Sequence, residues 1–269
     1  MRLWMLGSGS KGNAVLLESR ESRVLVDAGF APRTLATRLA AVGVAPESID
    51  ALVVTHEHID HVRGACAGAK RWGWALHASA GTVRAHPELA AAGATTFEAG
   101  ARITVGRFEL TSVGTSHDAE EPVAVLAEAD GARAVVATDM GWVTSAVASA
   151  CAGADILVLE SNHDEGMLRL GPYPAYLKAR IAGRKGHLSN VAAAAFARAM
   201  THRDLRHLVL AHLSETNNAP EVALDTMRVA LRGTRFRGGV CAAPQDGVLG
   251  PFCPGSERAR VASQLALAL

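Results

Sequence analysis

The sequence Ala51-Leu52-Val53-Val54-Thr55-His56-Glu57-His58-Ile59-Asp60-His61 decides how the rest of this chain can be interpreted. It opens with a short apolar run bounded by polar residues, which is typical of a strand buried on both faces of a sheet. It ends in three histidines and Asp60, and open α/β sheets bind ligands at the carboxyl ends of their strands. The stretch therefore predicts a ligand site at one edge of an α/β sheet.

The four polar side chains of this stretch have the chemistry of metal ligands. In an extended segment His56 and His58 point the same way, whereas Asp60 and His61 lie past the turn and approach from another side. Imidazole nitrogen and carboxylate oxygen together suit zinc, manganese or iron. The alternative is a polar loop of solvated histidines, and the clustering of three among only eleven histidines in 269 residues favours the metal.

The bulk composition is that of a globular protein. With 49% hydrophobic and 20% charged residues, we expect a single domain over residues 1–250 and a C-terminal tail over 251–269, read as a frayed helix. No apolar stretch reaches the roughly 18 residues of a membrane span. The apolar N-terminal run is shorter than the at least about 7 residues of a signal-peptide core, so we expect a cytoplasmic protein without membrane contact. A net charge of +1 gives no global attraction to nucleic acid, so such a partner must be sought in local patches.

Hydrophobic periodicity predicts an alternation of strands and helices along the chain. Expected helices cover residues 31–42, 62–72 and 191–200. Expected strands cover residues 3–6, 14–18, 23–27, 51–54, 75–78, 102–105, 108–113, 123–128, 132–138, 156–159 and 208–210. After residue 237, glycine and proline are so frequent that the sequence is uninformative.

The glycine-rich loop at residues 7–13 has two interpretations. It is either a tight connection between sheet strands, or a loop whose backbone amides, with Ser10 and Lys11, meet an anionic substrate. It lacks a following helical pattern, so it matches neither the phosphate-binding loop nor the dinucleotide-binding pattern. The structural interpretation is favoured.

Three later strands also end in a metal-type side chain. His117, Asp139 and His212 each follow an apolar run, as His56 does. A single histidine after a strand is usually structural, but the whole set numbers five histidines and two aspartates. Such a set suits a two-metal site in which Asp139 bridges the ions.

These residues, in this order, resemble the metallo-β-lactamase superfamily over residues 1–232. The motifs at residues 6–13, 138–141, 160–164, 171–174, 186–190 and 211–218 resemble its YycJ/WalJ branch, which is associated with 5′ to 3′ exonuclease activity on DNA. The resemblance implies an α/β fold, the four-layer αβ/βα sandwich, with the site along one edge of paired sheets. The β-lactamases usually have a cysteine at the place of Asp139, which argues against antibiotic hydrolysis.

The resemblance also implies how the ligands are shared between two divalent ions, zinc or manganese, with iron as a further option. His56, His58 and His117 hold one ion, and Asp139 bridges to the other. The second ion is held by Asp60, His61 and His212. Two such ions lower the pKa of a shared water and clamp the attacking and leaving oxygens of an in-line displacement, which suits a phosphodiester.

Asp60 and His187 are the predicted catalytic residues. His187 precedes a helix whose N-terminal amides favour an anion, and its position resembles that of a histidine loop in the related tRNA-processing ribonucleases. We expect it to supply the proton for the leaving oxygen. The alternative is that Ser189 or Asn190 caps the helix and His187 is incidental. Predicted substrate contacts on this side of the site are Asn162, His163, Ser189 and Asn190.

Residues 165–185 form the best candidate for holding nucleic acid. The segment contains five basic residues and one acidic residue, together with both tyrosines of the chain. Bases stack on aromatic rings while basic side chains follow the phosphates. The predicted contacts are Tyr173, Tyr176, Lys178 and Arg180. The alternative, a solvated helix face with its tyrosines packed on the core, has equal weight.

The leading hypothesis is a dinuclear-metal phosphodiesterase, a 5′ to 3′ exonuclease acting on single-stranded DNA ends through metal-bound hydroxide. A rival is a small-molecule phosphodiesterase or another ester or thioester hydrolase with the same site. A non-catalytic regulatory binding protein is a third alternative, and the complete set of seven ligands argues against it.

Overall fold

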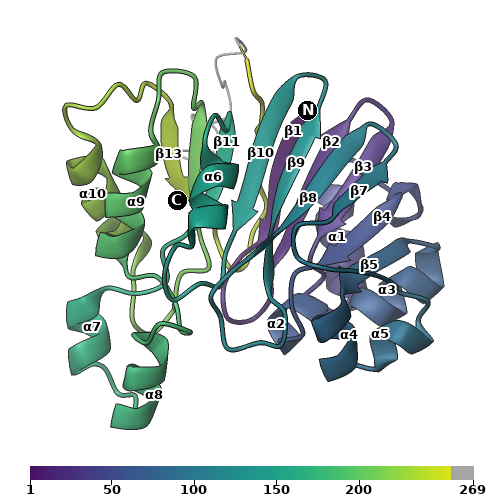
Figure 1. Cartoon of the computed structure of the whole chain (residues 1–269), viewed down its shortest axis with the longest axis horizontal. Coiled ribbons are helices and arrows are strands. Elements are labelled where there is room, and N and C mark those ends of the chain that lie inside the picture. Colours follow the sequence, from purple (N-terminus) through teal and green to yellow (C-terminus); the bar gives the residue numbers. More distant parts are fainter. Residues whose placement is uncertain (256–269) are drawn as a thin grey trace.

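Two seven-stranded sheets packed face to face form the body of the protein, and helices cover their outer faces. This arrangement is seen in a computed structural model that describes residues 1–255. In Figure 1 the helices α1 to α5 lie on the right, α6, α9 and α10 lie on the left, and α7 and α8 project below the sheets.

The first sheet contains the N-terminal half of the chain and one strand from its end. Its strands, in spatial order, are β14 (Leu249–Phe252), β1 (Arg2–Gly7), β2 (Ala14–Ser19), β3 (Ser22–Val26), β4 (Ala51–Val54), β5 (Ala75–Ser79) and β6 (Thr95–Phe97). Strands β3 to β6 run parallel, so their carboxyl ends meet at one edge.

The second sheet contains the C-terminal half. Its strands, in spatial order, are β13 (Gly239–Ala242), β12 (His207–Ala211), β11 (Ile156–Glu160), β10 (Ala132–Ala137), β9 (Val123–Ala129), β8 (Phe108–Gly114) and β7 (Arg102–Val105). Strands β10 to β13 are parallel, and β9 and β10 form the predicted hairpin around residues 130–131.

The helices follow the two halves of the chain. The first half contributes α1 (Pro32–Ala41), the 3₁₀ helix η1 (Pro46–Ser48), α2 (Ile59–Val62), α3 (Ala65–Trp72), α4 (Ala80–Ala85) and α5 (Glu88–Ala91). The second half contributes α6 (Ser145–Cys151), α7 (Glu165–Leu170), α8 (Ala175–Ile181), α9 (Asn190–Met200) and α10 (Pro220–Leu231). Among the helices of residues 1–255, none has the length and apolar character needed to cross a membrane.

Three apolar layers separate the four layers of secondary structure. On β1, Leu3 and Met5 face the second sheet, whereas Trp4 and Leu6 face outward and pack with Leu35 of α1. This alternation is the period of two that a strand buried on both faces requires. The second sheet is built the same way, with a third layer beneath α6, α9 and α10. The predicted four-layer αβ/βα sandwich is confirmed.

One sequence prediction needs correction. The helix expected over residues 62–72 begins at Ala65 as α3, whereas Val62 ends the separate helix α2, and the two helices meet at Gly64. The Gly64 amide donates to the Ala28 carbonyl at 2.7 Å, and a Cβ at position 64 would lie 2.2 Å from the Phe30 carbonyl oxygen. This close approach bends the chain, so that α2 carries Asp60 and His61 back toward the sheet edge.

The C-terminal part of the chain, where the sequence is uninformative, forms regular structure. The segment after residue 237 contains two strands, β13 and β14, each at the edge of a sheet. Because β14 pairs with β1, the first sheet continues beyond the boundary expected at residue 250. The remainder of the predicted tail, residues 256–269, lies outside the described residues. The division into domain and tail stays a prediction.

Candidate metal centre

The seven predicted ligands converge at the edge where both sheets end. The first sheet supplies His56, His58, Asp60 and His61, from the turn after β4 and from α2. The second sheet supplies His117, Asp139 and His212, which follow β8, β10 and β12. Within the described residues, four overlapping groups of potential ligand atoms lie there, each with its atoms within 4.8 Å of one another.

One group is made of His56, His58 and His117. His117 Nε2 lies 3.2 Å from His58 Nδ1, and the rings of His56 and His117 are 5.1 Å apart in an edge-to-face arrangement. The ring of His117 is also held by a distant part of the chain. His117 Nδ1 donates to the Gly186 carbonyl at 3.0 Å, and this hydrogen bond directs its Nε2 toward the other two rings.

A second group is made of Asp60, His61 and His212. Asp60 Oδ2 lies 3.2 Å from His212 Nε2 and 3.5 Å from His61 Nε2. Asp139 stands between the two groups. Its Oδ2 is 3.3 Å from His61 Nε2, and its Oδ1 is 3.8 Å from His117 Nε2.

Two polar atoms of the cluster are buried without a hydrogen-bond partner. They are His56 Nε2 and Asp139 Oδ2, although Asp139 Oδ2 has the charge contact with His61 described above, and both residues are almost completely buried. Leaving buried polar atoms unpaired costs about 1–3 kcal/mol each, so such atoms need an explanation. Nitrogen and oxygen donors at this spacing fit divalent transition metals, and bound ions would satisfy both atoms.

The electrostatics of the cluster favour ionised carboxylates, and they lower the pKa of two histidines while they raise the pKa of two others. Burial raises the pKa of the Asp139 carboxyl, but His212 and His61 lower it more, so that its net pKa is well below the ordinary value. Burial lowers the pKa of His56 and of His117, which keeps these rings neutral, the form that binds metals.

The other two histidine ligands are shifted in the opposite direction. Burial lowers the pKa of His212, but Asp139 and Asp60 outweigh burial and raise that pKa to about 9. Burial and the carboxylates around His61 compete in the same way, and the net pKa of His61 is well above the ordinary value. In the metal-free protein both rings carry a proton that a metal ion must displace.

Hydrogen bonds from residues behind the cluster hold the predicted ligands in place, and sequence analysis missed these residues. Asp27 Oδ2 accepts from His61 Nδ1 at 2.7 Å and from Thr55 Oγ1 at 2.9 Å. Carboxylates in this position orient a ligating ring and increase its basicity. Asp27, Asp139 and His212 also have positive φ values of 63°, 60° and 55°. Such values are uncommon outside glycine, and their concentration here places backbone strain at the site.

Glu160, the last residue of β11, is a further residue that sequence analysis did not assign to the site. It is fully buried, and its Oε1 accepts from His187 Nδ1 at 2.7 Å. Its Oε2 accepts from the amides of Met140 and Leu188 at 2.9 and 3.1 Å. These bonds leave His187 Nε2 as the free ring nitrogen. Both Glu160 and Asp27 stand at the end of a buried strand, the signal that identified the ligands.

A pocket of about 250 Å³ opens above the cluster. Besides ligands and His187, it is lined by the predicted contacts Ser10, Tyr173 and Arg180, and by Asp118. The Arg180 side chain, on α8, donates to Asp118 Oδ2 at 2.5 Å, and Asp118 Oδ1 lies 3.3 Å from His117 Nε2. This volume is below the roughly 300–1,000 Å³ of drug-sized ligand pockets, so it suits a short piece of a larger substrate.

Seven predicted substrate contacts do not line this pocket. Lys11 pairs with Glu215 at 2.8 Å, Lys178 donates to the Arg169 carbonyl at 2.8 Å, and Tyr176 is 76% exposed on α8. The other four are buried beneath the site and hydrogen-bonded or packed there: Asn162, His163, Ser189 and Asn190.

Three of these four residues make hydrogen bonds that hold the chain around the site. Asn162 donates to the His212 carbonyl at 2.9 Å, and Ser189 caps α9 by accepting from the Ala192 amide. Asn190 accepts from Ser161 Oγ at 2.6 Å. The capping alternative for Ser189 is thus observed. It does not make His187 incidental, because His187 faces the pocket.

Known proteins match this chain along most of its length. A family model described as the metallo-beta-lactamase superfamily matches residues 7–140. Exodeoxyribonuclease WalJ of Streptococcus pneumoniae is 37% identical over 230 residues, which cover 83% of this chain and 85% of WalJ. Exodeoxyribonuclease YycJ of Bacillus anthracis is 34% identical over 223 residues, which cover 81% of this chain and 84% of YycJ.

A solved structure agrees with these relatives in fold. Zinc-bound PqqB from Methylobacterium extorquens is 18% identical and superposes with a TM-score of 0.67, covering 93% of this chain and 100% of PqqB. That likeness shows the fold alone, whereas the two exodeoxyribonucleases are similar enough to show the family. The chain therefore belongs to the metallo-β-lactamase superfamily and, within it, to the family of WalJ and YycJ.

Proposed function

We propose that this protein is a metal-dependent exodeoxyribonuclease that hydrolyses DNA from a single-stranded 5′ end. Its relatives WalJ and YycJ are both named exodeoxyribonucleases. The observation that carries the proposal is the clustering of seven metal-type ligands, five of which line one pocket together with His187. A phosphodiester needs both, because its cleavage requires charge stabilisation and a proton for the leaving oxygen.

The ligand set fits two divalent ions. His56, His58 and His117 would hold one, Asp60, His61 and His212 would hold the other, and Asp139 would contact both. When bound, such ions supply an activated water and stabilise the charges of the attacking and leaving oxygens. Zinc and manganese both suit these donors.

His187 supplies the proton. Its Nδ1 is bound to Glu160 at 2.7 Å, which fixes the ring and leaves Nε2 facing the pocket. When the ring is protonated on both nitrogens, Nε2–H gives its proton to the leaving 3′ oxygen as the bond of that oxygen to phosphorus breaks, and the ring is left neutral with Nδ1–H on Glu160. Glu160 acts through His187, as a positioning residue.

Arg180 and Tyr173 hold the strand at the mouth of the pocket. Arg180 is 60% exposed and is bound to Asp118, so a phosphate can replace the carboxylate without a large movement of α8. Guanidinium groups bind phosphate oxygens in a fixed, forked geometry. Tyr173 lines the same pocket and offers a ring on which a terminal base stacks.

The experiment that tests this function uses the metal-loaded protein. We would incubate it with 5′-labelled and 3′-labelled oligonucleotides, single-stranded and duplex, and with bis-p-nitrophenyl phosphate. We expect stepwise shortening of single strands from the 5′ end, and loss of hydrolysis of every substrate in Asp139→Asn. Hydrolysis of the small ester with all DNA left intact would sink the nuclease proposal. Metal analysis of the same preparation identifies the ions, and cell fractionation tests the proposed cytoplasmic location.

A further inference from the structure

Trp142 is a large aromatic residue left at the surface. It is 43% exposed, and among residues 1–255 the other exposed large aromatic is Tyr176. The neighbouring Val143 packs against the core beneath the second sheet, but Trp142 does not belong to that core. Its ring is instead covered by Arg184, whose guanidinium carbon lies 4.9 Å from the ring centroid. We call these two residues the Trp142–Arg184 platform.

The platform is anchored to the metal centre through both of its residues. Trp142 follows the ligand Asp139 by three positions, and three residues of chain span at most about 11 Å. Arg184 precedes Gly186, whose carbonyl accepts from the ligand His117 at 3.0 Å. The indole and the guanidinium therefore lie within a few nucleotides of the pocket, since stacked bases rise by about 3.4 Å per step.

Two hydrogen bonds through Ser116 and one close contact hold the segment that contains Trp142 against the segment that contains Arg184. The Gly141 amide donates to the Ser116 carbonyl at 2.8 Å, and Ser116 Oγ donates to the Arg184 carbonyl at 2.6 Å. A Cβ at position 141 would lie 2.4 Å from the Arg184 carbonyl carbon, so only glycine lets the segments approach this closely. The platform thus has a fixed position relative to the ligands.

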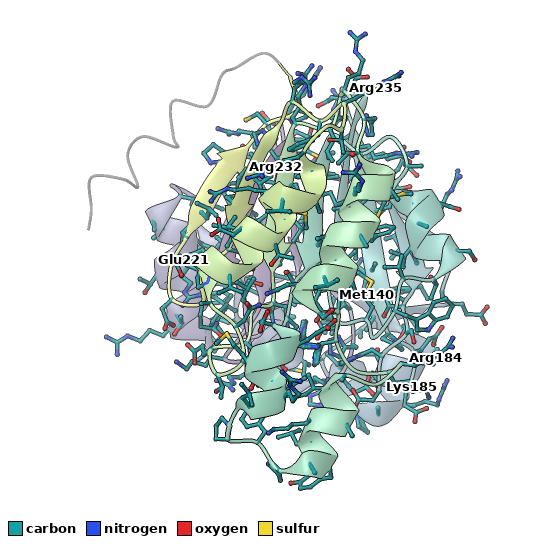
Figure 2. The ribbon with its side chains drawn as sticks, turned by 90° about the vertical axis from the view of Figure 1, so that its left-hand side faces the viewer. Met140, Arg184, Lys185, Glu221, Arg232 and Arg235 are labelled. Atoms are coloured by element: carbon teal, nitrogen blue, oxygen red, sulfur yellow. The ribbon has the colours of Figure 1, made fainter. Side chains whose placement is uncertain are left out.

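The charge around the platform is positive. Arg184 and Lys185 are both exposed, and Figure 2 shows them at the molecular surface, below Met140 and beside the lower helices. An aromatic ring combined with basic side chains at a surface is the arrangement that binds single-stranded nucleic acid, because bases stack on the rings while the cations meet the phosphates.

We propose that the Trp142–Arg184 platform is a base-stacking subsite that holds one nucleotide of the DNA strand outside the pocket. This inference rests on the proposed function and deepens it, since it assigns the part of the substrate that lies beyond the scissile bond. A base stacks on the indole or on the guanidinium, both of which accept any base. The subsite therefore selects unpaired strands without selecting their sequence.

The test scans a single-stranded oligonucleotide with one abasic position at a time. With the unaltered enzyme, KM rises at one abasic position by about tenfold, the size expected for loss of one base stack. In Trp142→Ala, KM rises by a similar factor on the intact strand, and the abasic position no longer matters. Trp142→Phe keeps a ring and recovers most of the affinity. Hydrolysis of bis-p-nitrophenyl phosphate stays unchanged in both variants.

The matched control uses another cation–π pair of an arginine with a tryptophan. Arg71 lies over Trp72, 5.5 Å from the ring centroid, on α3. Arg71→Ala is expected to leave KM for DNA unchanged, whereas Arg184→Ala raises it. Equal KM values for DNA in Trp142→Ala and the unaltered enzyme overturn the platform and leave the nuclease function standing. Failure of the unaltered enzyme to cleave any DNA overturns the nuclease function itself.

Discussion

Glu160 makes the hydrogen bond that orients the ring of His187 in the pocket. Glu160 is fully buried, and its two oxygens accept from the His187 ring and from two backbone amides. Glutamine has nearly the same shape, but one of its terminal atoms donates. In Glu160→Gln that amide NH₂ must face either His187 or the backbone N–H groups, so the ring loses its fixed orientation.

We expect His187→Ala to lower kcat for DNA by roughly 10² to 10⁴, the usual contribution of a general acid, with unchanged metal content. Glu160→Gln lowers kcat by less, and the double variant is no slower than His187→Ala, because residues that act as a unit are not additive. His86→Ala, at the end of α4, is the matched control and keeps full activity. Additive losses in the double variant would contradict the positioning role of Glu160.

Asp27 accepts the hydrogen bond that fixes the ring of His61, one of the seven predicted ligands. It has a φ of 63°, a conformation that asparagine tolerates as well as aspartate does, so Asp27→Asn keeps the backbone and removes the charge that faces His61 Nδ1. Loss of such a partner typically lowers metal affinity 10- to 100-fold. We expect that loss in a competition titration with a chromogenic chelator.

The control for Asp27 is Asp130→Asn. Asp130 also has a positive φ, 51°, and also accepts a short hydrogen bond, from Ser19 at 2.5 Å, but it lies in the β9–β10 turn. Its replacement is expected to leave metal affinity unchanged. If both variants lose affinity equally, the effect belongs to the backbone and not to the carboxylate beside His61.

At the scale of elements, the strand ends were predictable and the loops between them were not. Apolar runs located β4, β10, β11 and β12, because a strand buried on both faces needs continuous hydrophobic residues. The edge strands β13 and β14 have little apolar length, and their glycines and Pro251 look like turn residues in sequence. Only pairing with β12 and β1 makes them strands.

The site, like the fold, was predictable only in part from the sequence. Metal ligands have a distinctive side-chain chemistry and stood at strand ends, so the sequence predicted them. Asn162, Ser189 and Asn190 look like substrate contacts in sequence because they are polar and near His187. Their hydrogen bonds to His212, Ala192 and Ser161 depend on tertiary packing, which periodicity does not describe.

The approach of the β3–α1 loop to α2 is one such packing feature. A Cβ at Gly29 would lie 1.7 Å from the Asp60 carbonyl oxygen, so Gly29→Ala must displace α2 and the two ligands on it. We expect a decrease of about 1–3 kcal/mol in the free energy of unfolding, as for other overpacked sites, and weaker binding of one of two metal ions. Gly239→Ala is the control, since nothing lies within 4 Å of its Cβ position. Urea unfolding and metal analysis of both variants check the prediction.

Helix α8 contributes Arg180 to the mouth of the pocket. Arg180→Ala is expected to raise KM for DNA and to reduce the slope of log affinity against log salt by about 0.7, the value for one phosphate contact on a single strand. The small ester has no such strand, so its hydrolysis should not change. Arg228 is a matched control on α10, because it is 58% exposed and pairs with Asp225. A salt dependence unaltered in Arg180→Ala would show that this side chain does not contact a phosphate.

On the scale of the whole molecule, the metal centre joins the two halves of the fold. Four ligands belong to the first sheet and three to the second, and the ligands from both sheets meet where the sheets end. Ions bound there would connect the two sheets, which are also joined by the apolar layer between them and by hydrogen bonds such as the one from the Val123 amide to the Thr55 carbonyl. An ion that binds only the folded chain stabilises it by about 4 kcal/mol at a thousand times its Kd. Removing the metals should therefore lower the Tm of the entire domain.

The pH dependence of that effect follows from the two protonated histidines. The pKa of His212 rises from 6.5 to about 9 in the metal-free fold, so the proton stabilises this fold fully below pH 6.5, and the stabilisation is lost as the pH rises through 9. Over the same pH range a metal ion displaces the proton more easily, because a smaller fraction of His212 is protonated. Both effects enlarge the metal-induced increase in Tm between pH 6.5 and 9. Thermal unfolding of metal-loaded and chelator-treated protein, at a constant free metal concentration, measures the difference. An increase in Tm that is constant or falls with rising pH would mean that His212 binds no proton that the metal must displace.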